Sequence, residues 1–241
     1  MTRPKRVALF VTCLVDQIMP DVGVATVRLL RRAGFSVDFP EAQTCCGQPF
    51  FNSGFRAEAR DLADKTVALL EGYDAVVLPS GSCTTMIKVE YPHLLLDEPA
   101  RHAQAVALAA RTYELTQFLV QFAPDLLAGA SGGATVTYHD SCHMCRLLGE
   151  REAPRQMLRS AGHDIVEMAE ADRCCGFGGL FSVRMPEIAN AMSVEKLRQA
   201  ADTGAGLLVS ADPGCLMQLR GLLGSDQQAV HVATLLAEAL P

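Results

Sequence analysis

The sequence has no tryptophan, no excess of basic residues and no long apolar run. Its 21 Lys and Arg against 27 Asp and Glu give a formal charge of −6, which argues against a nucleic-acid or anionic-membrane surface, because such surfaces need a basic field. No apolar stretch approaches the ~20 residues of a membrane-spanning helix. The apolar run 7–15 is followed by Asp16 and by no small-residue cleavage site, so we interpret it as a strand rather than a signal peptide. These absences predict a cytosolic protein.

A dinucleotide-binding motif is also absent. No G-x-G-x-x-G sequence follows the first predicted strand, so a bound nicotinamide is not expected. The glycines Gly176, Gly178 and Gly179 follow a cysteine pair instead. We therefore assign them, with Gly47 after the other pair, to a cysteine-lined site, where backbone N–H groups can approach sulfur closely.

Nine cysteines are many for a cytosolic chain of 241 residues. Without a secretion signal, such a number indicates metal or redox chemistry rather than disulfides. Two pairs are adjacent, Cys45-Cys46 and Cys174-Cys175, and neighbouring cysteines rarely bridge each other because the peptide would be strained. The composition therefore predicts thiolate ligands.

The cysteines recur at a fixed spacing. Cys13 and Cys142, Cys45 and Cys174, and Cys46 and Cys175 are each 129 residues apart, while Cys83 and Cys215 are 132 apart. The flanking segments TCCGQPFFNSGF and RCCGFGGLFSVR also correspond. Internal duplication is the simplest explanation. The small-residue segment AGASGGA marks the seam, so we expect one domain over 1–128 and a second over 134–241.

Each half alternates strand and helix signals, and the expected fold is α/β. It consists of two pseudo-symmetric repeated domains, each a short parallel sheet flanked by helices in a Rossmann-like arrangement. The predicted strands are 7–12, 36–39, 75–78, 135–139, 165–168 and 207–210, and the predicted helices are 21–33, 57–70, 99–123, 152–161, 187–201, 215–223 and 231–240. Each repeated cysteine follows a strand. If the first strand of each half lies between the other two, the four sulfurs of that half meet at the carboxyl edge of its sheet.

Four thiolates select soft or borderline metals, namely zinc, copper(I) or iron–sulfur clusters. Most structural zinc sites use closely spaced C-x2-C pairs, whereas here one pair is adjacent and the other ligands come from distant strands. The spacing favours an iron–sulfur cluster over zinc, and leaves unligated redox thiols as a third reading.

The motifs FVTCL, FPEAQTCCGQPFFNSG, LPSGSC, YHDSCH, CCGFGGLFSVR and ADPGC resemble those of the CCG-domain, or cysteine-rich-domain, iron–sulfur oxidoreductases. The resemblance covers essentially the whole chain and is strongest to the branch that takes part in lactate oxidation. It implies a cytoplasmic subunit with an iron–sulfur cluster of the 4Fe-4S type, which acts in oxidising L-lactate, a small 2-hydroxy acid, to pyruvate. It also implies two partner subunits, one of them carrying ferredoxin-like clusters, and no activity without them. The metal ligands implied are Cys13, Cys45, Cys46, Cys83, Cys142, Cys174, Cys175 and Cys215.

The sequence departs from the wider family at one position of each half. Many CCG domains end in C-x-x-C, but Met86 and Gln218 stand three residues beyond Cys83 and Cys215. The missing fifth thiol argues against the disulfide-reducing chemistry of the heterodisulfide reductase type. The ninth cysteine, Cys145, is either an extra ligand in Cys142-x2-Cys145 or, more often for an unmatched cysteine, a small buried hydrophobe.

Polar residues are richer in the second half. His139 and His143 flank Cys142, and a histidine there can hydrogen-bond sulfur, carry a proton or touch substrate, although loop capping is the simpler reading. Arg146 and Arg184 offer forked donors for a carboxylate such as lactate, if they are not merely solvated. Catalytic residues are otherwise unassigned, and the second cysteine group is the expected active centre.

Two other functions remain open from the sequence. One is a zinc-binding structural or assembly subunit, with zinc in one or both sites. The other is a thiol–disulfide oxidoreductase that uses its cysteine pairs directly.

Overall fold

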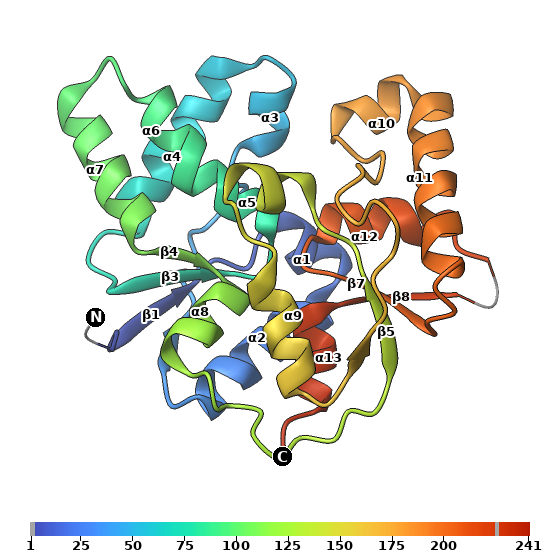
Figure 1. Cartoon of the computed structure of the whole chain (residues 1–241). Coiled ribbons are helices and arrows are strands. Elements are labelled where there is room, and N and C mark those ends of the chain that lie inside the picture. Colours follow the sequence, from blue (N-terminus) through green and yellow to red (C-terminus); the bar gives the residue numbers. More distant parts are fainter. Residues whose placement is uncertain (1–2, 225–226) are drawn as a thin grey trace.

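The computed structural model describes residues 3–224 and 227–241, and its strands form one four-stranded parallel sheet in each half (Figure 1). Every strand pair in the two sheets is parallel. The first sheet has the order β2 (Ser36–Asp38), β1 (Arg6–Leu9), β3 (Ala75–Leu78), β4 (Thr112–Glu114), and the second has the order β6 (Asp164–Ile165), β5 (Thr135–Tyr138), β7 (Leu207–Ser210), β8 (Gln228–His231). The α/β class and the two repeated parallel sheets are confirmed, and each first strand lies between the second and third, as the meeting of the four sulfurs requires.

The fourth strand of each sheet corrects the sequence-based expectation. The segment 99–123 was expected to be helical throughout, but β4 divides it into α7 (Pro99–Ala110) and α8 (Leu115–Phe122). In the second half β8 likewise precedes α13 (Val232–Glu238). These strands are short, and β4 is fixed by pairing with β3, with Thr112 opposite Val76 and Glu114 opposite Leu78. Pairing partners of this kind are not visible in local periodicity.

The core follows from the alternation of side chains along the strands. In β1, Val7 and Leu9 point into one apolar cluster, while Ala8 and the following Phe10 point into another. The second of these clusters lies entirely within the first half. The first continues through both halves and includes Val136 and Tyr138 of β5. One hydrophobic core is therefore shared by the two repeats.

The helices that cover the shared core cross from one half to the other. Helix α13 packs on α2 (Pro20–Arg32) of the first half, and α8 of the first half packs on α9 (Glu152–Ser160) of the second. Figure 1 shows these four helices together in the lower centre of the molecule, between the two sheets. Within residues 3–224 and 227–241, no helix combines the length and the apolar character needed to cross a bilayer.

The remaining helices lie around the two sheets, and the helices that directly follow β1 and β7 contact each other where the two halves meet (Figure 1). Gly162 and Gly34, at φ +82°, follow the ends of α9 and α2 and let the chain turn back into a strand, a conformation that glycine adopts without strain. The first half contributes α1 (Cys13–Ile18), α3 (Gln48–Asn52), α4 (Arg56–Leu69), α5 (Gly81–Thr85), the π-helix Met86–Glu90 and α6 (Tyr91–Leu94); the second contributes the π-helix His143–Leu147, α10 (Leu180–Arg184), α11 (Pro186–Ala201) and α12 (Pro213–Arg220).

Candidate metal centres

Four thiols of the first half meet beyond the carboxyl ends of its strands, and we call them the first quartet: Cys13, Cys45, Cys46 and Cys83. Cys13 opens α1 directly after β1, the adjacent pair follows β2, and Cys83 lies in α5 after β3. The Sγ atoms of Cys13 and Cys45 are 3.7 Å apart. The Cys46 thiol interacts with those of Cys45 and Cys83. The topology thus gathers sulfurs that are up to 70 residues apart in sequence.

The second half repeats this arrangement with Cys142, Cys174, Cys175 and Cys215, the second quartet. Cys142 precedes a π-helix after β5, the adjacent pair follows β6, and Cys215 lies in α12 after β7. Contacts run from Cys142 to Cys174, on to Cys175 and then to Cys215. All nine cysteines lie in the described part of the chain and none is in a disulfide.

Backbone N–H groups approach sulfur in both quartets, as the glycines after the pairs predicted. The N–H of Gly47 donates to Cys45 Sγ, and that of Gly176 donates to Cys174 Sγ, each at 3.4 Å. Both glycines have positive φ, +88° and +92°. At Gly176 a Cβ atom would lie 2.3 Å from the carbonyl oxygen of Ala189, so only glycine fits between this loop and α11. Such donors stabilise negative charge on sulfur.

Each quartet has one thiol that ionises readily and others that do not. Hydrogen bonds from Cys13, Cys46 and the Gly47 N–H lower the pKa of Cys45 to about 3, and Cys142, Cys175 and Gly176 lower the pKa of Cys174 to about 2. The pKa of Cys13 is raised by its hydrogen bond to Cys45 and then by burial, and that of Cys142 by its bond to Cys174 and then by burial. Four adjacent thiols do not all ionise unless a cation offsets their repulsion.

Unpartnered polar groups beside the thiols also fit a metal or cluster. The Thr12 hydroxyl, next to Cys13, is buried and has no hydrogen-bond partner, and Thr12 holds the strained φ of +72°. Both ring nitrogens of His139 are buried without a partner. Burial, followed by the charge of Lys196, lowers the pKa of His139 to about 3, so the ring is neutral. Buried polar atoms without partners are rare and call for an explanation. Both quartets therefore fit soft-metal binding, as a single ion or as a cluster.

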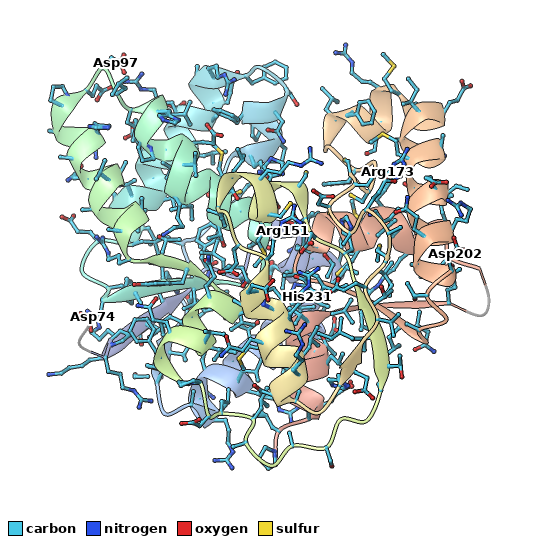
Figure 2. All side chains as sticks on the ribbon, in the orientation of Figure 1. Asp74, Asp97, Arg151, Arg173, Asp202 and His231 are labelled. Carbon is cyan, nitrogen blue, oxygen red and sulfur yellow. The ribbon has the colours of Figure 1, made fainter. Side chains whose placement is uncertain are left out.

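One carboxylate joins the two quartets. Asp212 caps α12, and its Oδ1 accepts from the N–H groups of Gly214 and Cys215 at 3.1 and 3.4 Å. Its Oδ2 accepts from the Ser82 N–H at 2.7 Å and from the Ser141 hydroxyl at 3.3 Å. Ser82 precedes Cys83 and Ser141 precedes Cys142. Asp212 therefore fixes segments of both quartets at the junction of the halves, where His231 also lies (Figure 2).

A buried ion pair holds the segment that carries Cys142. Arg155 of α9 donates to both oxygens of Asp140 at 2.8 and 3.0 Å, and to Glu167 at 2.6 and 2.9 Å. Asp140 and Arg155 are almost fully buried. Arg151, labelled near the middle of Figure 2, adds a contact to Asp140 at 3.9 Å. Removing one partner of such a pair leaves a buried charge uncompensated, which is strongly destabilising.

A cavity of about 70 Å³ lies between the halves at the second quartet. Its walls combine Gln48, Asn52 and Ser82 of the first half with the loop 174–179 and the second-quartet thiols. A second cavity, about 320 Å³, adjoins the first quartet, and Asp16 and Glu41 are among its lining residues. The cavity at the second quartet is thus enclosed by both repeats, while that at the first is acidic.

The remaining residues proposed from the sequence differ in how close they lie to the second quartet and its cavity. His143 lines the cavity at the second quartet, with Nδ1 3.7 Å from Cys142 Sγ. Arg146 donates to the Asp172 carbonyl at 2.9 Å, and Arg184 ends α10; neither lines that cavity. Cys145 is buried, and its Sγ lies 3.8 Å from the Cys142 carbonyl oxygen. Burial raises the pKa of its thiol, and the nearby charges that act on it most are those of Asp140, Arg151, Arg146 and Asp172.

Sequence reasoning missed two polar residues near the second quartet. Asp212 was visible only as part of the ADPGC motif, and an Asp-Pro step before a helix is a capping signal that would have identified it. Lys196 of α11 is fully buried, and its Nζ donates to the carbonyl oxygens of Glu170 and Ala171, 2.5 and 3.3 Å away, just before the cysteine pair. Nothing in a helical sequence signals that one lysine is turned inward.

The chain matches one family model twice, described as "Cysteine-rich domain" and named CCG, over residues 7–88 and 136–220. It is 47% identical over 235 residues to Lactate utilization protein A of Geobacillus kaustophilus, covering 96% of this chain and 98% of the relative. It is 46% identical over 228 residues to Lactate utilization protein A of Bacillus subtilis, covering 94% and 95%. A crystal structure of a hypothetical protein from Helicobacter pylori matches with a TM-score of 0.68 and 9% identity. That match covers 99% of this chain and 51% of that structure, and it bears on the fold alone.

Proposed function

The chain belongs to the CCG cysteine-rich-domain family, and from this premise we propose that it is an iron–sulfur electron-transfer subunit of an assembly that oxidises L-lactate to pyruvate. The observation that carries the proposal is the pair of thiol quartets at the carboxyl edges of two parallel sheets. Relatives named for lactate utilization match this chain over almost their whole length, which supports the substrate. The partners are a ferredoxin-like iron–sulfur subunit and a third lactate-utilization subunit.

Lactate oxidation releases two electrons and two protons. A conventional 4Fe-4S cluster accepts one electron at a time, so two centres in one chain, or one centre and a partner, match the stoichiometry. We assign the reacting end to the second quartet, because its cavity is enclosed by both halves and His143 lines it. The Gly176 and Gly47 N–H groups stabilise charge on Cys174 and Cys45. Without partner subunits we expect no lactate oxidation.

The proposal places the protein in the cytoplasm. All nine cysteines are unbridged in this structure, and thiols kept for metal binding persist in a reducing compartment.

Anaerobic purification followed by iron, sulfide and zinc counting tests the proposal. We expect a brown protein with an absorption shoulder near ~400 nm, easily seen because the chain has no tryptophan and four tyrosines. Cys142→Ser and Cys13→Ser should each remove the iron of one half, while Cys145→Ser, the matched control, should retain it. A colourless protein without iron contradicts the proposal.

Zinc is the second candidate because one distance favours it. A tetrahedral zinc–thiolate site with bonds of ~2.3 Å places its sulfurs about 3.8 Å apart, and Cys13 Sγ lies 3.7 Å from Cys45 Sγ. Stoichiometric zinc in the anaerobic protein would support a structural or assembly role.

A further inference from the structure

His139 lies directly beyond β5, among the thiols at the inner end of the second quartet. Its backbone N–H donates to the Val209 carbonyl at 2.8 Å, which fixes the residue beside β7. One of its ring nitrogens and the Sγ atoms of Cys175 and Cys215 all lie within 4.8 Å of one another. The side chain is fully buried, and neither ring nitrogen has a hydrogen-bond partner. The imidazole is therefore held against two thiols, with the Ala171 backbone beside it and no well-formed hydrogen bond to either ring nitrogen.

Among the residues that the structure describes, no histidine lies against the thiols of the first quartet in this way. The repeat offset of 129 residues aligns His139 with Phe10. Phe10 is fully buried and packs in the apolar cluster that contains Cys46 and Cys83, the counterparts of Cys175 and Cys215. The sulfurs of the two quartets thus correspond by the repeat, while the aromatic side chain behind them is an apolar phenyl ring in the first half and an imidazole in the second.

The spacing suits a shared metal better than a hydrogen bond. The nitrogen makes no hydrogen bond to either sulfur. Three atoms that are at most 4.8 Å apart have a common point within about 2.8 Å of each, and small shifts bring that point to the ~2.0–2.1 Å Zn–N and ~2.3 Å Zn–S bond lengths. A neutral imidazole offers one lone pair for this purpose.

We propose that His139 is a nitrogen ligand of the second metal centre, and that the first centre has thiolate ligands only. The assignment rests on the proposed function, since it requires a metal in the second quartet. It makes the two centres chemically unequal. Imidazole is neutral where thiolate is anionic, so the second centre has one donor that adds no negative charge.

X-ray absorption at the edge of the bound metal, on the anaerobically purified full chain, tests the assignment. We expect sulfur scatterers plus a nitrogen contribution at ~2.0–2.1 Å, averaged over two centres. His139→Phe, which installs the residue of the first half, should abolish the nitrogen contribution. It should also speed loss of metal from the second centre to a chelator by about ten-fold or more.

His163→Phe is the matched control. His163 is also buried with both ring nitrogens unpartnered, but it packs against Gly132, away from the cysteines. It should leave the nitrogen contribution and the metal content unchanged. A wild-type spectrum with sulfur scatterers only overturns the assignment while the proposed function stands, even if His139→Phe fails to fold. A nitrogen contribution that persists in folded His139→Phe overturns it too. A protein without metal overturns the proposed function and this assignment together.

Discussion

Glu114 is a buried carboxyl group whose protonation affects stability. It caps α8, accepting from the N–H groups of Thr116 and Gln117, and burial raises its pKa to about 7 from an ordinary 4.5. The folded protein therefore binds this proton more tightly than the unfolded chain does. The stabilisation is full below about pH 4.5 and is lost as the pH rises through 7, by at most about 3 kcal/mol. The free energy of unfolding should fall across this window.

Glu114→Gln should flatten that fall, as measured by denaturant unfolding between pH 4.5 and 8. Two titratable groups face Glu114: Glu150, which bonds to Gln117, and Tyr138, whose pKa is raised by burial and then by Glu114. Glu150→Gln is the control, because it removes a neighbouring charge and leaves the buried carboxyl in place. An unchanged pH dependence in Glu114→Gln would contradict the assignment.

Gly176 and Gly179 form a matched pair in one loop. Both have positive φ, which is strained for an L-residue. Only at Gly176 would a Cβ meet other atoms, with Ala189 O at 2.3 Å and Ser193 Oγ at 3.0 Å. Gly179→Ala should lose only the conformational part. Gly176→Ala should lose about 1–3 kcal/mol more, because α11 must shift, and should also lose metal from the second quartet. Equal losses in denaturant unfolding and metal counting would show that the close approach to α11 is unimportant.

At the scale of elements, Asp212 does more than cap the N-terminus of α12. Asp212→Ala removes acceptors for four donors on three segments and should lower the free energy of unfolding by about 2–4 kcal/mol. Asp212→Asn keeps one oxygen and should recover part of this loss. The comparison is Ser80→Ala at the equivalent cap of α5. The Ser80 hydroxyl accepts from the Cys83 N–H at 3.2 Å and lies 3.3 Å from the Ser82 hydroxyl, but it makes no contact with the second half. The cost of this substitution should be nearer 1 kcal/mol. Equal costs in denaturant melts would argue against a bridging role.

The elements also show which features a sequence can reveal. Strands β3 and β7 were predicted to the residue, because apolar runs that alternate with helices are local signals. The position of each first strand between the other two was only a condition for the cysteines to meet, and the structure meets it. The repeat spacing then predicted that the cysteines of each half meet at one edge of its sheet. The edge strands β4 and β8 were missed because pairing with a neighbour, and not local pattern, decides segments of three or four residues. The contacts of Asp212 to Ser82, and of His139 to Cys175 and Cys215, join distant segments and have no local signal.

At the scale of the whole molecule, the seam in sequence differs from the boundaries of the core. The linker near 128–134 separates two repeats, and 1–128 and 134–241 remain our predicted domains. Yet α13 of the second repeat covers α2 of the first, and α8 covers α9. Buried Leu29 and Leu30 of α2 belong to the same apolar cluster as Val232 and Leu236 of α13. Each repeat therefore supplies a helix that completes the core of the other.

This exchange of helices predicts that the repeats fold together. Produced alone, 1–128 would expose the apolar face of α2 that α13 covers, and 134–241 would expose that of α9; burial of such faces supplies most of the stability of a small domain. We expect neither fragment alone to give a cooperative thermal transition, while the two co-expressed fragments should purify as a 1:1 complex. Leu236→Asp in α13, fully buried in the wild type, should abolish that complex, whereas Glu238→Gln at the end of the same helix should leave it intact. A cooperative thermal transition from each isolated fragment would contradict this prediction. It would mean that each repeat has a sufficient core of its own, and that the contacts between helices of different repeats contribute little to its stability.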